Sequence, residues 1–169
     1  MTISLPDEGA VSPIDKTAWV MDSIMNAIIE VFDFYDIELP ALKYLTVGEP
    51  VHDCEQVTVT ILQGYLGSPG LQSEDPQPCN GPRSGVFQVE IVRCVDDGSV
   101  TNLRQRSGGT TAPDPEKISE YTRSRTRDLW ALLEVPQHLN DYNQAIADAG
   151  ITEMRGKYQA VVLNLVVQI

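Results

Sequence analysis

The chain has 169 residues, 42% of them hydrophobic, which is enough apolar material for a single domain with its own core over residues 1–169. Acidic residues outnumber basic ones by 24 to 12, and the net charge of −12 argues against a specific nucleic-acid partner, because phosphate binding needs clustered cations. No apolar run approaches the roughly 18 residues of a membrane helix, and the acidic start is unlike a secretory signal, so we expect no membrane partner.

The first predicted element is a long amphipathic helix over about residues 15–36, preceded by an extended N-terminal arm over residues 1–14. Its apolar side chains recur at steps of three and four residues, the period of a helix with one buried face. Pro40 closes the segment, because the residue before a proline disfavours the helical conformation. The stripe expected in the core consists of Trp19, Ile24, Met25, Ile28, Ile29, Val31, Phe32 and Tyr35.

Three strands are predicted next, a short one over about residues 43–48 and two long ones over about 54–65 and 84–95. The long strands alternate apolar and polar side chains, as in VTVTIL and VFQVEIV, which indicates one buried face and one polar face. We expect the polar faces, with their threonine, glutamine and glutamate side chains, to meet water or another subunit.

A second amphipathic helix is predicted over about residues 114–134, with Arg123 and Arg127 on its exposed side. Its buried stripe would hold Ile118, Tyr121, Leu129, Leu132 and Leu133. A short third helix over 140–148, ended by Gly150, and a final strand in GKYQAVVLNLVVQI complete the chain. The order of the elements predicts an α+β fold in which an antiparallel sheet of about four strands has two long helices packed on one face.

Two connections are long and rich in proline or glycine, over residues 66–83 and 96–113. They leave the two ends of the hairpin formed by the long strands. Loops of this length inside a compact domain usually carry function, so we expect them to make the contacts with other proteins.

The search for catalytic chemistry is negative. The chain lacks a P-loop and a nucleophile elbow, and its two histidines are His52 and His138. We therefore expect neither enzymatic activity nor a cofactor.

The three cysteines leave several states open. Cys54 begins one long strand and Cys94 ends the next, so antiparallel pairing would make them neighbours, with alpha carbons within about 7 Å. Together with Cys79 and His52 they could form a Cys3His zinc set, although the spacing lacks a CxxC knuckle. A Cys54–Cys94 disulfide is a second alternative. We predict reduced cysteines and no metal, because the protein is expected to be made inside a cell.

Charge is segregated along the chain, with an acidic segment over residues 1–55 and a basic one over 101–127. Opposite charges on one molecule suit head-to-tail contacts between copies, and a solvated surface is the alternative. The candidate subunit interface sets Arg104, Arg106, Arg123 and Arg127 of one copy against Asp33, Asp36 and Glu38 of another.

The segments VHDCEQVTVT and PCNGPRSGVFQVEIVRC, with the amphipathic helix before them, resemble the neck-region proteins of tailed phages of actinobacteria, and among these the tail terminators. The likeness extends over residues 15–169. It implies a homohexameric ring of the virion, made in the host cytoplasm, that caps the major tail tube protein and contacts the head-to-tail stopper. A head-to-tail stopper or adaptor, or a monomeric binding module, is the alternative function.

A ring of this kind would let DNA pass through its channel without binding it. Carboxylates repel phosphates, whereas cations would hold them. We therefore expect acidic side chains to outnumber basic ones on a channel surface made of sheet or loop, with Glu90, Asp96 and Asp97 as candidates.

Overall fold

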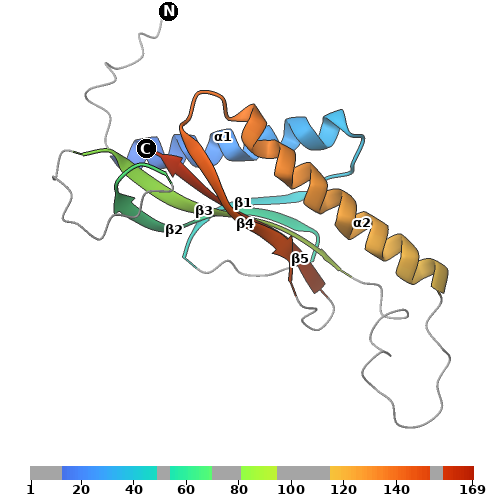
Figure 1. The fold of residues 1–169 in the computed structure, drawn as a ribbon. Coiled ribbons are helices and arrows are strands. Elements are labelled where there is room, and N and C mark those ends of the chain that lie inside the picture. The colour runs from blue at the N-terminus through green and yellow to red at the C-terminus, as the bar shows by residue number, and fades with distance from the viewer. Residues whose placement is uncertain (1–12, 49–53, 70–80, 95–114, 153–157) are drawn as a thin grey trace, which may run out of the picture.

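The computed structural model describes residues 13–48, 54–69, 81–94, 115–152 and 158–169 (Figure 1). The predicted helices over 15–36 and 114–134 and all the predicted strands correspond to elements of the structure, and most of the predicted N-terminal arm lies outside the described residues. In chain order the elements are helix α1 (Pro13–Phe34), strands β1 (Leu42–Val47), β2 (Gln56–Leu66) and β3 (Arg83–Cys94), helix α2 (Pro115–Glu134), the 3₁₀ helix η2 (Val135–His138), and strands β4 (Gln144–Ile151) and β5 (Tyr158–Gln168).

Both long helices lie on the same face of one sheet (Figure 1), and the core forms between them and that face. Alternate residues of β2, β3 and β5 enter the core, as the period of a strand requires. Trp19 and Tyr35 differ from the expected stripe, because both are about half exposed. Tyr35 follows the last residue of α1, so the helical period no longer directs its side chain inward. The largest buried apolar side chains are Ile24, Ile28, Phe32, Phe87, Ile91, Leu132, Leu163 and Leu165.

The strand order in the sheet is β1-β2-β3-β5-β4. The α+β fold is confirmed, but the sheet has five strands instead of about four, and it is mixed instead of antiparallel. β1 runs parallel to β2, whereas the other neighbours are antiparallel. A chain that spans up to about 3.5 Å per residue can return along so short a strand within the few residues between β1 and β2, of which 49–53 lie outside the described residues.

β4 occupies the place of the predicted third helix over 140–148, and that prediction is wrong. The segment pairs with the apolar strand β5 instead. At its start, the side-chain amide of Gln144 donates to the carbonyl oxygens of Pro136 and Leu139 at the end of η2. Local propensity here permits a helix, but pairing with β5 decides the outcome.

Five polar residues form a line across the sheet on the face away from the helices. The strand registers place Thr46, Thr60, Gln88, Asn164 and Asp148 side by side, one on each strand. The hydroxyl oxygens of Thr46 and Thr60 are 2.7 Å apart, and Gln88 Nε2 donates to Asn164 Oδ1 at 3.1 Å. Asn164 Nδ2 in turn donates to Asp148 Oδ1. We call these five residues the polar row.

The polar face is less exposed than the alternation predicts, because Thr58, Thr60 and Glu90 are all buried. These residues lie on the inner strands β2 and β3. Side-chain hydrogen bonds satisfy part of the face, since Gln56 Nε2 donates to Thr58 Oγ1 along β2 at 3.1 Å, in addition to the bonds of the polar row. The prediction that this face meets water or another subunit is therefore wrong for these three side chains, which are buried within a single copy.

Gly85 should resist substitution. A Cβ at this position would lie 2.7 Å from the buried ring of Phe87 and 2.9 Å from a methyl carbon of Ile169. Gly85→Ala is expected to lower the free energy of unfolding by about 1–3 kcal/mol, because a close-packed core absorbs added volume poorly. Gly150→Ala is the matched control, since its Cβ would meet nothing within 4 Å. Urea unfolding of the two variants checks this, and equal midpoints would contradict it.

Candidate functional site

The residues that the structure describes contain no group of three or more histidine, cysteine, aspartate or glutamate side chains placed to hold a metal ion. In the same part of the chain, no helix combines the length and apolar character needed to cross a membrane. The zinc alternative involves His52 and Cys79, which lie outside the described residues.

The most buried charges form an ionic network between α2 and the sheet. Asp128 is 1% exposed, and its carboxylate faces two guanidinium groups. Arg93 donates from Nε to Oδ2 of Asp128 at 2.9 Å and from Nη2 to Oδ1 at 3.1 Å, which is a bidentate pair. Arg125 Nη2 lies 3.3 Å from the same Oδ2. Arg93 Nη1 also lies 3.7 Å from Oε2 of the half-exposed Glu55, so Asp128 is the only buried carboxylate that faces these two cations in the described chain.

Further contacts connect this network to two other parts of the fold. Arg93 Nη2 also donates to the carbonyl oxygen of Glu38, after the end of α1. The guanidinium carbon of Arg125 lies 5.4 Å from the centre of the Tyr121 ring, a cation–π distance. The Tyr121 hydroxyl donates to Gln159 Oε1 on β5 at 2.7 Å. The network thus fixes α2 against β3, β5 and the segment after α1.

Burial shifts the pKa of two residues, Arg125 and Tyr121. Burial lowers the pKa of Arg125, and the Asp128 carboxylate opposes that shift. Burial also raises the pKa of Tyr121. The Nε and Nη1 atoms of Arg125 are buried and have no hydrogen-bond partner in the described part of the chain. These features fit a structural role better than a catalytic one, because the ionic groups are turned away from solvent.

Sequence reasoning missed this network, although the spacing along α2 contained a signal for it. Arg125 and Asp128 continue the stripe of Tyr121 and Leu132 at steps of four, three and four residues. Charged residues within an apolar stripe indicate a buried pair, because solvated charges belong on the opposite side of the helix. Arg93 could not be recognised in this way, since it comes from β3.

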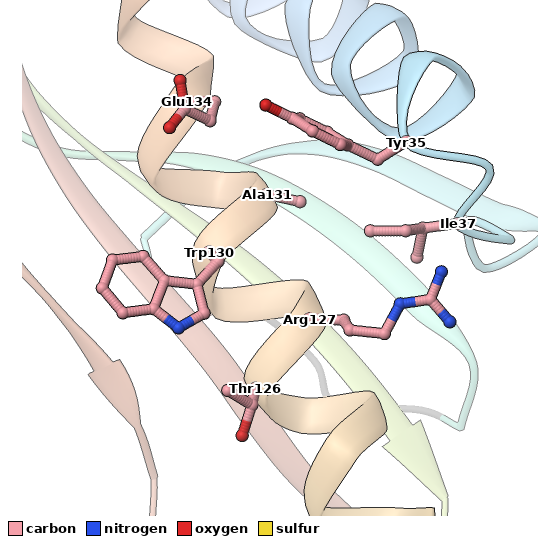
Figure 2. A pocket seen from close by; sticks show the side chains of 7 residues that line it. All are labelled: Tyr35, Ile37, Thr126, Arg127, Trp130, Ala131 and Glu134. Carbon is pink, nitrogen blue, oxygen red and sulfur yellow. The ribbon is translucent and has the colours of Figure 1, made fainter.

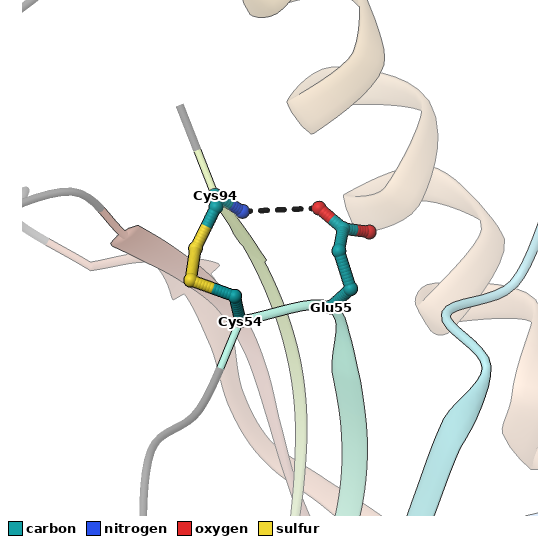
Figure 3. The surroundings of a disulfide bond; sticks show 3 residues. All are labelled: Cys54, Glu55 and Cys94. Atoms are coloured by element: carbon teal, nitrogen blue, oxygen red, sulfur yellow. Dashed lines mark hydrogen bonds between the residues drawn. A yellow bond between two sulfur atoms is a disulfide. The ribbon is translucent and has the colours of Figure 1, made fainter. Parts of the chain in front are cut away.

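A disulfide joins Cys54, just before β2, to Cys94 at the end of β3 (Figure 3). Their alpha carbons are 5.2 Å apart, so the predicted proximity is confirmed, whereas the predicted reduced state of these two cysteines is wrong. The antiparallel register pairs Gln56 with Val92, and two further residues bring the cysteines opposite each other. The expectation of free thiols rested on the compartment and not on this geometry. Glu55, the residue after Cys54, has a positive φ of 56°, and its Oε1 accepts a hydrogen bond from the Cys94 backbone N–H at 3.0 Å.

An open groove of about 290 Å³ lies between the end of α1 and α2 (Figure 2). Tyr35 and Ile37 line it from one side, and Arg127 and Trp130 line it from α2. The Trp130 side chain is 64% exposed. Phe34, also exposed, packs edge-on against Tyr35 with ring centres 4.9 Å apart. Exposed aromatic rings beside charged side chains are typical of protein contact surfaces.

The predicted subunit-interface residues lie on the surface where they are described. Asp33, Asp36 and Glu38 are exposed and line a second groove of about 450 Å³. Arg123 and Arg127 are exposed on α2, as predicted. Arg127 Nη2 donates to the carbonyl oxygen of Asp36 at 3.4 Å, so one basic and one acidic candidate already meet within a single copy.

The other candidates are placed only in part. Glu90 lies on the face of the sheet away from the helices, but it is 7% exposed and offers little charge to a channel. Arg104, Arg106, Asp96 and Asp97 lie outside the described residues. So does most of the two predicted contact loops, since residues 70–80 and 95–114 are not described.

β1 is the most exposed strand of the sheet. In the described chain no strand pairs with its outer side. Val47 is 83% exposed, and the other exposed apolar residues of this strand are Leu42, Tyr44 and Leu45. At the opposite edge, β4 exposes Ile146 and Ile151. An open, apolar edge strand is a template for pairing with another chain.

No protein-family model matches this chain, and no curated protein matches it.

Proposed function

We propose that this chain is a ring-forming structural protein of a long-tailed phage, the tail terminator that caps the tail tube and joins it to the head-completion proteins. The observation that carries the proposal is the five-stranded sheet. Both of its edges are open in the described chain, and the face away from the helices lacks lysine and arginine in every described strand.

The open edges support self-assembly. Apolar side chains are exposed at β1 and at β4, on opposite sides of the same sheet. A chain in which two different sheet edges can bind each other associates head to tail. A head-to-tail contact closes into a ring when the rotation between copies permits it. Closure removes both edges, which otherwise favour uncontrolled aggregation.

The cation-free face suits the wall of a DNA channel. Its charged residues on the described strands are Glu90 and Asp148, and Asp148 is the exposed one. Phosphates would find no ion pair on such a wall and would slide past it. The basic side chains Lys43, Arg83 and Arg93 take the other face, where α1 and α2 pack.

The partners in this proposal are the chain itself, the major tail tube protein and the head-to-tail stopper. The long connections over 66–83 and 96–113 would contact the tube and the stopper, because loops on a rigid sheet are where binding is usually placed. The protein would then be found in the virion.

Reversing the charge of Arg123 and Arg127 tests the predicted subunit contact. We expect the purified protein to have the mass of a six-fold ring by light scattering, and Arg123→Glu with Arg127→Glu to shift it toward the monomer. Both side chains are exposed, so the melting temperature should change little. The control is Arg127→Glu alone. It shows the effect of losing the hydrogen bond from Arg127 to the Asp36 carbonyl oxygen within one chain.

Two results would count against the proposal. A wild-type protein that stays monomeric, alone and with purified tail tubes, would favour a binding module that uses the groove beside Trp130. A double reversal that assembles normally would show that these arginines are solvated surface.

A further inference from the structure

We infer that β1 of one copy pairs with β4 of a second copy as an antiparallel strand, in a register that sets Thr46 opposite Asp148. This inference rests on the self-assembly part of the proposed function and names the surface that carries it. It does not depend on the tail or on DNA.

The directions of the strands permit this pairing. β1 runs with β2, β2 runs against β3, β3 against β5, and β5 against β4. β1 and β4 therefore run in opposite directions. A second copy placed beside the first in the same orientation brings its β4 antiparallel to β1 and keeps the helices of both copies on the same side of the extended sheet.

The backbone hydrogen bonds fix which residues point outward at each edge. Gly48 N–H donates to the Ile61 carbonyl, so the alternation along β1 turns the N–H and C=O groups of Thr46 toward β2 and those of Leu45 outward. At the other edge, Thr152 N–H donates to the Ala160 carbonyl.

Counting back along β4 from that bond gives the matching alternation. Asp148 and Gly150 turn their backbone groups toward β5, and Ala149 turns its groups outward. With Thr46 opposite Asp148, the outward groups of Leu45 meet the outward groups of Ala149. The backbone of both edges is therefore satisfied in this register, whereas a slip by one residue would set inward groups against outward ones.

The side chains also fit this register on both faces. On the face away from the helices, Tyr44 would lie opposite Gly150, whose missing side chain leaves open space for the ring. On the helix face, Leu45 would lie beside the partly buried Ala149. The β-bulge between Ile146 and Asp148 falls beyond this stretch, next to Val47.

The polar row supports the same register independently. It begins at Thr46 on one edge and ends at Asp148 on the other. Asp148 is exposed and its carboxylate already accepts from Asn164, which leaves further acceptor capacity for a hydroxyl group. In the assembled sheet the row of one copy would continue into the row of the next.

Cysteine pairs test the contact directly. In a background with Cys79→Ser, we expect a mixture of the Thr46→Cys and Asp148→Cys variants to form a covalent dimer after oxidation with diamide, because facing residues of this type bring Cβ atoms to about 4.5–5.5 Å. The double variant should give a covalent ladder on a non-reducing gel. Tyr44→Cys mixed with Asp148→Cys is the matched control, which is two residues out of register and should cross-link at least ten-fold more slowly.

The outcomes separate this inference from the proposed function. Cross-linking of Thr46→Cys with itself would show a two-fold β1–β1 contact and overturn the inference. A ring that forms by light scattering without cross-linking of the matched pair would also overturn it, while the proposed function stands. A cross-linked ring that does not attach to tail tubes would support the inference and overturn the tail-terminator assignment.

Discussion

Replacing Asp128 by alanine is expected to lower the free energy of unfolding by about 3–5 kcal/mol, because the buried Arg125 guanidinium would lose its carboxylate and Arg93 would keep only the half-exposed Glu55 at 3.7 Å. Arg93 and Arg125 both lie within 3.3 Å of Asp128 Oδ2. Apart from Asp128, Arg125 donates in the described chain only to the Ser124 hydroxyl, at 3.0 Å, and its buried Nε and Nη1 atoms have no hydrogen-bond partner there. Guanidinium chloride unfolding followed by circular dichroism measures the change.

Two further variants make this experiment decisive. Asp33→Ala removes an exposed aspartate from α1 and should change stability by less than about 0.5 kcal/mol. The triple change Arg93→Met, Arg125→Met and Asp128→Leu should recover most of the loss, because an apolar set of similar volume needs no charge compensation. If Asp128→Ala costs no more than Asp33→Ala, the network does not hold α2 to the sheet.

Removing the disulfide should have an effect of similar size. Cys54 and Cys94 are separated by 40 positions, and the loss of loop-closure entropy in the unfolded chain for such a loop corresponds to about 4 kcal/mol. Cys54→Ser with Cys94→Ser is therefore expected to lower the unfolding midpoint strongly. The native sheet should persist, since β2 and β3 remain paired along their full length.

The control for this experiment uses the third cysteine and a reductant. The Cys79→Ser variant should have the unfolding midpoint of the wild type. Dithiothreitol should lower the midpoints of this variant and of the wild type by the same amount. The double serine variant should be insensitive to dithiothreitol. A wild-type protein whose midpoint does not move with reductant would show that the bond does not form in solution.

Periodicity made the long elements predictable. The helical repeat alone predicts the buried stripe of Ile24, Ile28 and Phe32. The two-residue period of a strand alone predicts which side chains of β2 and β3 enter the core. The neighbouring positions of Cys54 and Cys94 also followed from the sequence, because a hairpin pairs residues whose numbers have a constant sum. These features are local or involve one hairpin.

Features that depend on residues distant in the sequence could not be predicted from local patterns. β4 is a strand because β5 offers it a partner, and its residues alone do not require this. The parallel direction of β1 is seen only in its pairing with β2. The edge positions of β1 and β4 depend on the order of all five strands, which the chain order does not reveal. For this reason the sequence led to charged side chains as the candidate interface, whereas the structure adds two strand edges.

In the proposed ring, the hydrogen bonds of the polar row would resist stretching of the wall. Pressure from within a ring stretches its wall along the circumference, at right angles to the strands, and this is the direction in which the side-chain bonds of Thr46, Thr60, Gln88, Asn164 and Asp148 lie. If the row is repeated from copy to copy, its side-chain hydrogen bonds would carry part of this tension together with the backbone hydrogen bonds between the strands. Opening the β1–β2, β3–β5 or β5–β4 pair would break a side-chain hydrogen bond of the row as well, so the wall of the proposed ring would stretch less.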